Sequence, residues 1–378
     1  MLRTNEKGIL SLINSALCGK KINLPLEFSL SEALPIILNH GIANICYYGA
    51  VNCGIDKKDP AMQKLFAVSV NYMAQNERKL KVLDEIYKAF NKTGISYMAL
   101  KGAALQKIYP KSDMRALGDI DLLIDPKQYD LIKSEIIKLG FTEQNESDHE
   151  YIWTNPVCVL EFHKYLIPSY HTELHNYFGE GFFRATKSGS EYVLSKEDNF
   201  LYLLGHFAKH YRGGGIGLRH FLDLYVYKMH YKDLDENYIL AETEKMGIRE
   251  FYINLQKTFK ACFLNAEFSP VSISIVEYVF NSGKFGTKES IATANAMRDG
   301  KTKAGSILST IFLSYDRMVI KYRFLKKLPF LLPVMWIYRI ITLPFKGKKH
   351  INNITNSVNA YTDEDINNLK EHLKSVGL

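Results

Sequence analysis

Residues 115–125 are RALGDIDLLID, a stretch that sets two aspartates two positions apart within an apolar run. Alternate side chains of a β-strand point to the same face of the sheet. Asp119 and Asp121 are therefore expected on one face, with the apolar residues between and after them on the other. Two carboxylates this close repel each other unless a cation lies between them, and Mg²⁺ is commonly held by one or two carboxylates. The pair predicts a metal site, with a solvated strand end as the alternative.

A phosphate-binding turn is expected just upstream of this strand. ISYMALKG (95–102) is predicted to be a short strand that runs into a glycine, and AALQKIY (103–109) a short helix. A glycine at such a turn lets the backbone approach a phosphate, and the helix N-terminus offers free N–H groups. We therefore predict phosphate contacts for Lys101 and Gly102. Arg115 either joins them or is a solvated loop arginine.

A third acidic residue lies in a later apolar segment, VCVLEFHKYL (157–166). Alternation places Glu161 and His163 on one face of this predicted strand, where a glutamate buried without a partner is costly. If this strand pairs with residues 119–124, Glu161 completes a set of three carboxylates. Such a set holds two metal ions for in-line attack at phosphorus, and the third carboxylate also takes the proton of the acceptor.

The chain is expected to fold as an α+β protein with a small mixed sheet flanked by helical regions. Apolar residues at three- and four-residue spacing predict helices before the sheet and after it. Asp125 and Gln128 are expected to form a capping box at the start of a helix, and Ser195 with Asp198 another. The predicted parts are an N-terminal helical region (1–93), an α/β core (94–190), a C-terminal helical domain (191–345) and a basic linker with a terminal helix (346–378).

KGAALQKIYPKSDMRALGDIDLLI (101–124) followed by LEFHKYL (160–166) resembles the uncharacterised nucleotidyltransferase family of the DNA polymerase β superfamily. The resemblance covers roughly residues 95–225 and extends more weakly over the helical lead and the segment FLLPVMWIYR (330–339). It implies a polymerase β-like nucleotidyltransferase core. Carried over by position, it assigns the phosphate turn, the metal ligands and the third carboxylate to Gly102, Asp119, Asp121 and Glu161.

The resemblance implies an enzyme that moves a nucleoside monophosphate from an NTP donor to a hydroxyl acceptor and releases pyrophosphate. Its implied cofactor is Mg²⁺, with two ions per site and Mn²⁺ as the alternative. Two acceptor classes are expected, a small molecule or a tRNA, the latter as in toxin-type nucleotidyltransferases. A non-catalytic nucleotide-binding or scaffold protein on the same fold is the alternative of a different class. Ala103, where the superfamily has a second glycine or a serine, favours that alternative, and retention of three carboxylates opposes it.

Two histidines lie one helical turn apart in GHFAKH (205–210). His206 and His210 are expected either to pack as ordinary buried side chains or to line the nucleotide or acceptor pocket. In the resembled family a similar pair precedes an Arg-x3-Asp helix, which here carries Arg219 and Asp223. These two residues also have the spacing of an ordinary helical ion pair. His163 is a further candidate for the pocket.

The net charge of +8 comes from one segment, because residues 317–349 hold nine basic side chains and no acidic one. Its apolar part, LPFLLPVMWIYRIITLP (328–344), is short and interrupted by three prolines and an arginine. We therefore expect a buried helix with a basic rim and no transmembrane span. Peripheral contact with an anionic membrane or with RNA is the alternative.

The five cysteines are scattered and form no CxxC motif. This pattern argues against a disulfide framework or a zinc ribbon and is typical of a reducing compartment. The first 21 residues carry an apolar run that is too short and too interrupted for a signal peptide. The expected location is the cytoplasm.

Overall fold

The computed structural model describes residues 1–284, 286–298, 312–313, 315, 318–319, 322–342 and 361–378. They form two compact units. The first consists of Met1–His210, Ile216–Lys284 and Val376–Leu378, and the second of Tyr211–Gly215 and Phe285–Ser375. The sheet and all the sequence-predicted site residues belong to the first unit.

The lead of the first unit is helical, as its apolar spacing predicted. Its last helix begins where the carboxylate of Asp59 accepts hydrogen bonds from the N–H groups of the first turn. It ends at Gly94, whose φ of 71° is a left-handed conformation that favours glycine. The helices are α1 (Thr4–Cys18), α2 (Leu30–Asn39), α3 (Ala43–Cys53) and α4 (Pro60–Thr93).

A seven-stranded mixed sheet follows, in the order β3-β4-β5-β2-β1-β7-β6. The pairs β2–β5 and β1–β7 are parallel, and the other neighbours are antiparallel. This confirms the predicted α+β class. The strands are β1 (Tyr97–Leu100), β2 (Ile120–Ile124), β3 (Thr142–Glu146), β4 (Glu150–Thr154), β5 (Val159–His163), β6 (Ala185–Ser188) and β7 (Glu191–Leu194).

Three strands, β3, β6 and β7, had not been predicted. β3 is TEQNE and β6 is ATKS, so neither shows the apolar alternation that identifies a half-buried strand. Most of their side chains are exposed. They belong to the sheet because each pairs with a neighbouring strand in a hairpin.

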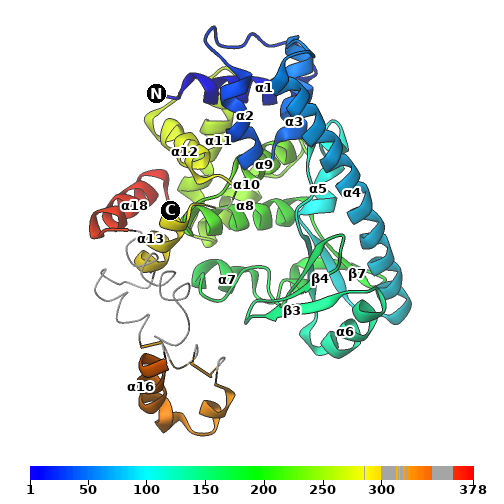
Figure 1. The fold of residues 1–378 in the computed structure, drawn as a ribbon, viewed down its shortest axis with the longest axis vertical. Coiled ribbons are helices and arrows are strands. Elements are labelled where there is room, and N and C mark those ends of the chain that lie inside the picture. The colour runs from blue at the N-terminus through cyan, green and yellow to red at the C-terminus, as the bar shows by residue number, and fades with distance from the viewer. Residues whose placement is uncertain (285, 299–311, 314, 316–317, 320–321, 343–360) are drawn as a thin grey trace. The chain divides into compact units, whose positions relative to one another are not determined.

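One face of the sheet packs against α4 and α6 (Tyr129–Lys138) (Figure 1). Ile120 and Leu122 of β2 and Leu160 and Phe162 of β5 lie in this core, together with side chains of both helices. Because strand side chains alternate, the acidic residues of β2 and β5 lie on the opposite face. The apolar residues of DIDLLI therefore hold the strand against the core. Its two aspartates are not used in this packing.

One of the two predicted capping boxes does not form. Asp125 accepts a hydrogen bond from the N–H of Lys127, as expected for an N-cap. Gln128 does not reach back to it, because a 3₁₀ turn (Pro126–Gln128) precedes α6. Its amide oxygen instead accepts from the N–H of Ser96 at 2.8 Å, and its amide nitrogen donates to the carbonyl of Gly94. Gln128 thus ties the end of α4 to the sheet.

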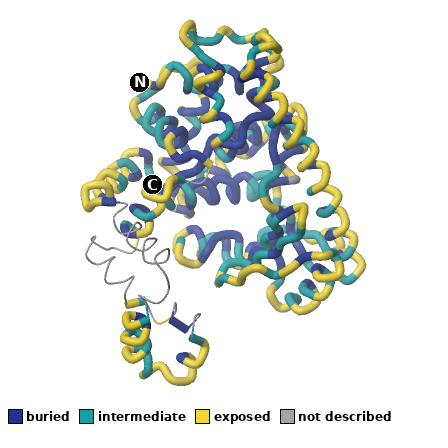
Figure 2. The backbone as a smooth tube through the Cα atoms, viewed as in Figure 1, coloured by how far each residue is buried: buried dark blue, intermediate teal, exposed yellow. Residues whose placement is uncertain are grey.

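The helices after the sheet begin at Ser195, whose Oγ accepts from the N–H of Asp198 and donates to its carboxylate, so that the N-cap half of the second predicted capping box is confirmed. Figure 2 shows that α8 and α9 are almost wholly buried, in contrast to the largely exposed α4. Loop 213–217 joins α8 to α9. The remaining helices of the first unit are α5 (Gly102–Gln106), α7 (Thr172–Phe178), α8 (Lys196–Arg212), α9 (Leu218–His230), α10 (Glu236–Lys245), α11 (Arg249–Phe263) and α12 (Pro270–Ser282).

The second unit contains α13 (Lys288–Arg298), α16 (Leu332–Thr342) and α18 (Asp363–Val376). The prediction that 328–344 forms a buried helix is wrong for its outer side, where Phe330, Val334 and Ile337 are more than half exposed. Only its inner side packs on the small cluster around Met318 and Leu325. Within the described residues, every helix is too short or too polar to span a bilayer. Of the nine basic residues of segment 317–349, five lie outside the described part of the chain, namely Arg317, Lys321, Lys346, Lys348 and Lys349.

Candidate functional site

The turn between β1 and α5 is held in a strained conformation. Lys101 has φ 47° and ψ −118°. Residues with a Cβ rarely adopt this backbone conformation, which costs on the order of 1–3 kcal/mol. Its Nζ lies 3.0 Å from Oδ1 of Asp121. Gly102 has room for a Cβ, which would make only ordinary contacts with Leu117 and the carbonyl of Asp119. The strain therefore lies at the lysine and not at the glycine.

The parallel pairing of β2 with β5 brings two carboxylates side by side. Asp121 is directly opposite Glu161 in the register. His163, two residues further along β5, places Nε2 2.9 Å from Oδ1 of Asp121 and 3.7 Å from Oε2 of Glu161. One ligand atom from each of the three residues lies within 4.8 Å of the others, so the group is able to hold a cation.

The two carboxylates titrate in opposite directions. Burial alone would raise the pKa of Asp121, but the Lys101 ammonium and the hydrogen bond from His163 outweigh it and hold the pKa well below its ordinary value. Burial raises the pKa of Glu161 to about 8, and the negative charges of Asp121 and Glu150 add to this rise. Without a cation, one carboxylate of the pair is therefore ionised and the other protonated at neutral pH.

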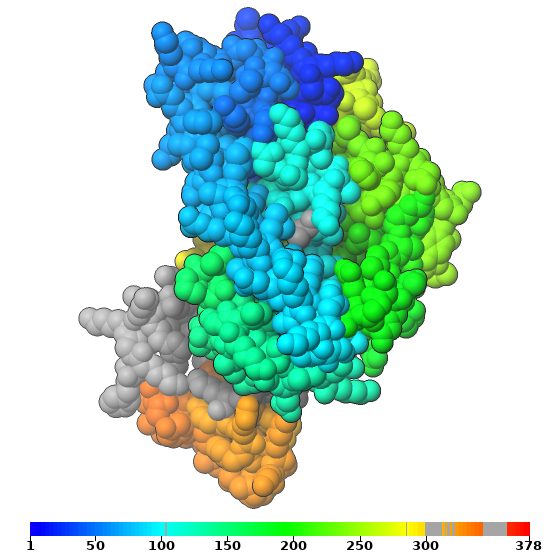
Figure 3. Space-filling model, turned by 90° about the vertical axis from the view of Figure 1, so that its right-hand side faces the viewer, coloured from blue at the N-terminus to red at the C-terminus, as the bar shows by residue number. Residues whose placement is uncertain are grey.

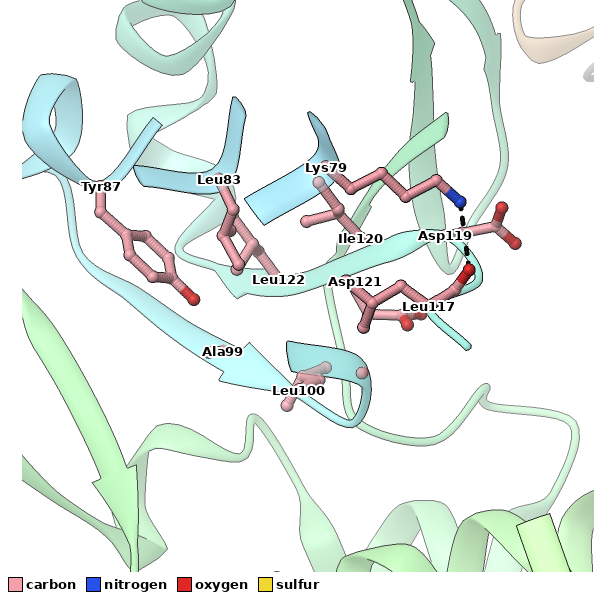
Figure 4. Close-up of a pocket in the computed structure, with 11 residues that line it drawn as sticks. Lys79, Leu83, Tyr87, Ala99, Leu100, Leu117, Asp119, Ile120, Asp121 and Leu122 are labelled. Atoms are coloured by element: carbon pink, nitrogen blue, oxygen red, sulfur yellow. Dashed lines mark hydrogen bonds between the residues drawn. The ribbon is translucent and has the colours of Figure 1, made fainter. Parts of the chain in front are cut away.

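Asp119 lies just before β2 and does not join the Asp121–Glu161–His163 group. Asp119 and Asp121 instead both line a small pocket that opens to solvent and is also lined by residues of α4, β1 and the loop before β2 (Figure 4). Lys79 of α4 also lines this pocket. Its Nζ donates to the carbonyls of Leu117 and Gly118, at 3.1 and 2.8 Å. In the space-filling view α4 crosses this side of the first unit in light blue, next to cyan and green residues that follow it in the chain (Figure 3).

Helix α4 also positions the loop that leads to Asp119. The side chain of Asn76, which is buried, accepts from the N–H of Leu117 at 2.8 Å and donates to the carbonyl of Arg115 at 3.2 Å. Gln106 donates to the same carbonyl at 2.6 Å. Sequence reasoning missed Asn76 and Lys79, because polar residues on a long helix usually face solvent and neither belongs to a motif.

Arg115 does not lie free for a phosphate, and this corrects the prediction made for it. Its Nε and Nη2 lie 2.7 and 2.8 Å from the two carboxylate oxygens of Asp223 on α9. Tyr109 donates a further hydrogen bond to Asp223 at 2.9 Å. Both charged side chains are 4% exposed. The expected helical pair of Asp223 with Arg219 is also wrong, because the ion-pair partner of Asp223 among the described residues is Arg115, which holds it in a bidentate geometry.

Arg219 instead packs against the loop next to Asp119. A Cβ added at Gly118 would lie 3.4 Å from its Nη2. Arg219 is 8% exposed, and among the described residues its Nε has no hydrogen-bond partner. Burial and then the charge of Arg115 lower its pKa. An arginine in this position is able to receive an anion.

The predicted histidine pair lies on α8 with Nε2 atoms 3.1 Å apart. The ring of His220 on α9 is 5.8 Å from that of His206 and 6.5 Å from that of His210, between centroids. Burial lowers the pKa of all three imidazoles well below the ordinary value. Lys209 lies between the pair in sequence, is 9% exposed, and its pKa is lowered to about 7 by burial and by the charge of Lys101.

A model of the uncharacterised nucleotidyltransferase family matches residues 27–263 of this chain. The match includes the helical lead from α2 onward, the whole sheet and the helices α8 and α9, and it does not include the apolar segment 328–344. No curated protein and no solved structure matches the chain significantly. The resemblance found in the residues of β1, β2 and β5 is confirmed over more than half of the sequence. The chain therefore belongs to the uncharacterised nucleotidyltransferase family.

Proposed function

We propose that this protein is a metal-dependent nucleotidyltransferase that moves a nucleoside monophosphate from an NTP to a hydroxyl acceptor. Membership of the family supports nucleotidyl transfer in general. The observation that carries the finer proposal is the register that sets Asp121 opposite Glu161 on adjacent parallel strands. Asp119 is the residue just before β2. Three acidic residues, Asp119, Asp121 and Glu161, therefore lie near the first residues of this strand.

The donor set fits a hard divalent cation. Asp121 and Glu161 offer carboxylate oxygens, which Mg²⁺ prefers, and Asp119 supplies a third carboxylate beside the pocket. When bound, Mg²⁺ would polarise the phosphoryl oxygens and offset the charge that develops on them. His163 donates Nε2–H to Asp121 and so orients that carboxylate.

Glu161 is the residue proposed to take the proton from the acceptor hydroxyl. General bases are most effective when their pKa lies near the working pH, and the pKa of Glu161 is raised to about 8. Asp121, whose pKa is held low by Lys101, stays ionised throughout. In this proposal Asp121 serves as the permanent metal ligand and Glu161 as the proton acceptor.

The triphosphate is proposed to lie against the cations around Asp119. Lys79 and Arg219 approach the loop before β2 from α4 and α9, and Lys101 lies on its other side next to Asp121. Arg115, which is held by Asp223, is proposed to position this loop and not to touch the nucleotide. Gly102 lines the pocket, and α5 has only five residues, so we assign the phosphates to side chains and not to its N-terminus.

The proposal is tested by the melting temperature with each of the four NTPs, with and without Mg²⁺. We expect an upward shift that needs both Mg²⁺ and one NTP and that is absent in the Asp119→Ala/Asp121→Ala variant. Asp84→Asn is the matched control, because Asp84 is an exposed carboxylate on α4 that pairs only with Lys88 among the described residues. No shift with any NTP would favour the scaffold alternative.

The acceptor class is tested separately, by the salt dependence of binding. An RNA acceptor releases counterions, so its affinity falls steeply as salt rises. A small-molecule acceptor would be far less sensitive. Binding of tRNA is measured at about 50 and about 200 mM salt. Loss of binding over this range, together with transfer of NMP to tRNA, would identify RNA as the acceptor.

A further inference from the structure

A second group of metal-ligand side chains lies on the far side of His163 from the carboxylate pair. The Nδ1 atom of His163 is 3.1 Å from Nε2 of His149 and 3.6 Å from Oε2 of Glu150. The distance from Nε2 of His149 to Oε2 of Glu150 is 4.0 Å. One ligand atom from each of these three residues lies within 4.8 Å of the others. Nothing in the proposed transfer reaction uses His149 or Glu150.

The backbone holds this group in place through the β3–β4 turn. The Oγ of Ser147 accepts hydrogen bonds from the N–H groups of His149 and Glu150, at 3.2 and 3.0 Å. The N–H of Lys164 donates to the carbonyl of His149 at 2.8 Å. Glu150 is directly opposite His163 in the β4–β5 register. The three donors therefore come from β5, from the first residue of β4 and from the turn just before it.

The charges around His163 favour a bound cation. Three carboxylates, those of Asp121, Glu150 and Glu161, lie within 3.7 Å of one or the other of its ring nitrogens. Among the described residues, Lys101 is the one ammonium in ion-pair contact with any of them.

The hydrogen bond from His163 to Asp121 is of the kind that orients a metal-ligating histidine. A histidine that ligates a metal usually donates its other ring N–H to a carboxylate, which fixes the tautomer and the ring orientation. His163 donates Nε2–H to Asp121 at 2.9 Å, so Nδ1 is the unprotonated nitrogen of the ring. Two ligands at about 2.0–2.1 Å from a tetrahedral Zn²⁺ lie about 3.3 Å apart. The three observed separations are 3.1, 3.6 and 4.0 Å, so Oε2 of Glu150 has to move a few tenths of an ångström towards His149 when the ion binds.

We propose that His149, Glu150 and His163 form a transition-metal site of the Zn²⁺ type, separate from the carboxylate site for Mg²⁺. The ligand atoms are Nε2 of His149, Oε2 of Glu150 and Nδ1 of His163, and a water completes the coordination. Such an ion positions His163, and through its Nε2–H the carboxylate of Asp121. The role is therefore one of positioning and not of catalysis.

The His206–His210 pair is the competing candidate and serves as a control. Its Nε2 atoms are also 3.1 Å apart. Among the described residues, however, no third His, Cys, Asp or Glu ligand atom joins the pair within 4.8 Å. The pair has two donors where the His149 group has three.

The test is metal binding to the full chain after a chelator has been dialysed away, with no nucleotide present. Co²⁺ is the probe, because bound Co²⁺ of low coordination number absorbs visible light far more strongly than the hydrated ion, and Zn²⁺ is then used to displace it. We expect one Co²⁺ per chain with a strong visible band. His149→Ala and Glu150→Gln should each weaken binding at least tenfold, and Asp121→Asn about 10- to 100-fold as the loss of a supporting carboxylate.

Asp119→Asn and His206→Ala are the matched variants that should keep the band. Loss of the band in Asp119→Asn, with retention in His149→Ala, would assign the ion to the carboxylate site and overturn the proposal. Loss in His206→Ala alone would assign it to α8 and overturn it as well, and so would a wild-type chain that binds no Co²⁺ or Zn²⁺. His149→Gln and the melting temperature of each variant in chelator separate loss of a ligand from loss of the fold. Because no NTP is used, these outcomes are independent of nucleotidyl transfer.

Discussion

Two buried ion pairs lie at this site, and they differ in how firmly they are held. Lys101 and Asp121 share a single contact of 3.0 Å, with side chains 13% and 11% exposed. Arg115 and Asp223 share two contacts, of 2.7 and 2.8 Å, and both are 4% exposed. The first pair joins residues 20 positions apart, and the second joins residues 108 positions apart.

The neighbours of the two pairs differ more than their geometry does. Beside Lys101 a second carboxylate, Glu161, is protonated in the absence of a cation because its pKa is about 8. It is able to ionise if Asp121 is lost. Among the described residues, Arg115 has only Asp223 as an ion-pair partner. We infer that the Lys101–Asp121 pair is exchangeable, so that a metal ion is able to replace the ammonium at Asp121. The Arg115–Asp223 pair is permanent and ties the loop before β2 to α9.

The largest expected effect is on transfer, through the exchangeable pair. We predict that Asp121→Asn lowers the transfer rate by at least about 10⁴-fold, equal to more than 5 kcal/mol, because it removes a metal ligand. The melting temperature should change little, because ionised Glu161 replaces Asp121 as the counterion of Lys101. Single-turnover transfer and thermal unfolding check the two parts. Substantial transfer by this variant would remove Asp121 from the metal site.

The next effect is on stability, through the permanent pair. We predict that Asp223→Asn or Arg115→Met alone lowers the free energy of unfolding by about 3–5 kcal/mol, because each leaves a buried charge without its partner. The Arg115→Met/Asp223→Leu double variant should recover much of the loss, because no uncompensated charge remains. Urea unfolding of the three variants measures this. If Asp121→Asn destabilised the protein as much as Asp223→Asn, the contrast between the pairs would be disproved.

A smaller effect concerns Lys209. Burial and the charge of Lys101 lower the pKa of Lys209 from 10.5 to about 7 in the folded chain. Between those values the unfolded state binds more protons, so the free energy of unfolding rises with pH in that window. Below about pH 7 both states are protonated and the full cost of burying the charge is present. Lys209→Met should therefore stabilise the protein at pH 7 by up to about 4 kcal/mol and flatten the rise towards pH 10.

Urea unfolding at several pH values between 6.5 and 10 measures this difference. Lys88→Met is the control, because Lys88 is an exposed lysine of α4 and its removal should leave the pH dependence unchanged. An unchanged slope in Lys209→Met would mean that the amine is solvated in the folded protein.

The smallest effect concerns Arg219, the cation next to the permanent pair. We predict that Arg219→Ala raises the KM for NTP about tenfold, or about 1.4 kcal/mol, with a smaller change in kcat, because Arg219 is proposed to contact the phosphates of the bound nucleotide. Steady-state kinetics with Mg²⁺ check this, and the melting temperature without NTP should change little. An unaltered KM would leave Lys79 and Lys101 as the proposed triphosphate ligands.

The local patterns of the sequence were sufficient for the elements at the centre of the site. Alternation in DIDLLI and VLEFH predicted which side chains of β2 and β5 enter the core and which lie on the other face. Ser195 predicted the start of α8. These features depend on neighbours within a few residues, so the sequence states them directly.

The partners of the charged residues were decided by tertiary structure alone. Nothing in the sequence near Arg115 points to Asp223, and nothing near Lys79 points to the loop before Asp119. His149 and Glu150 follow an exposed strand with no apolar alternation, and they meet His163 because β4 pairs with β5 in one register. A periodic pattern specifies which face a side chain takes, whereas the packing of distant segments determines what that side chain meets there.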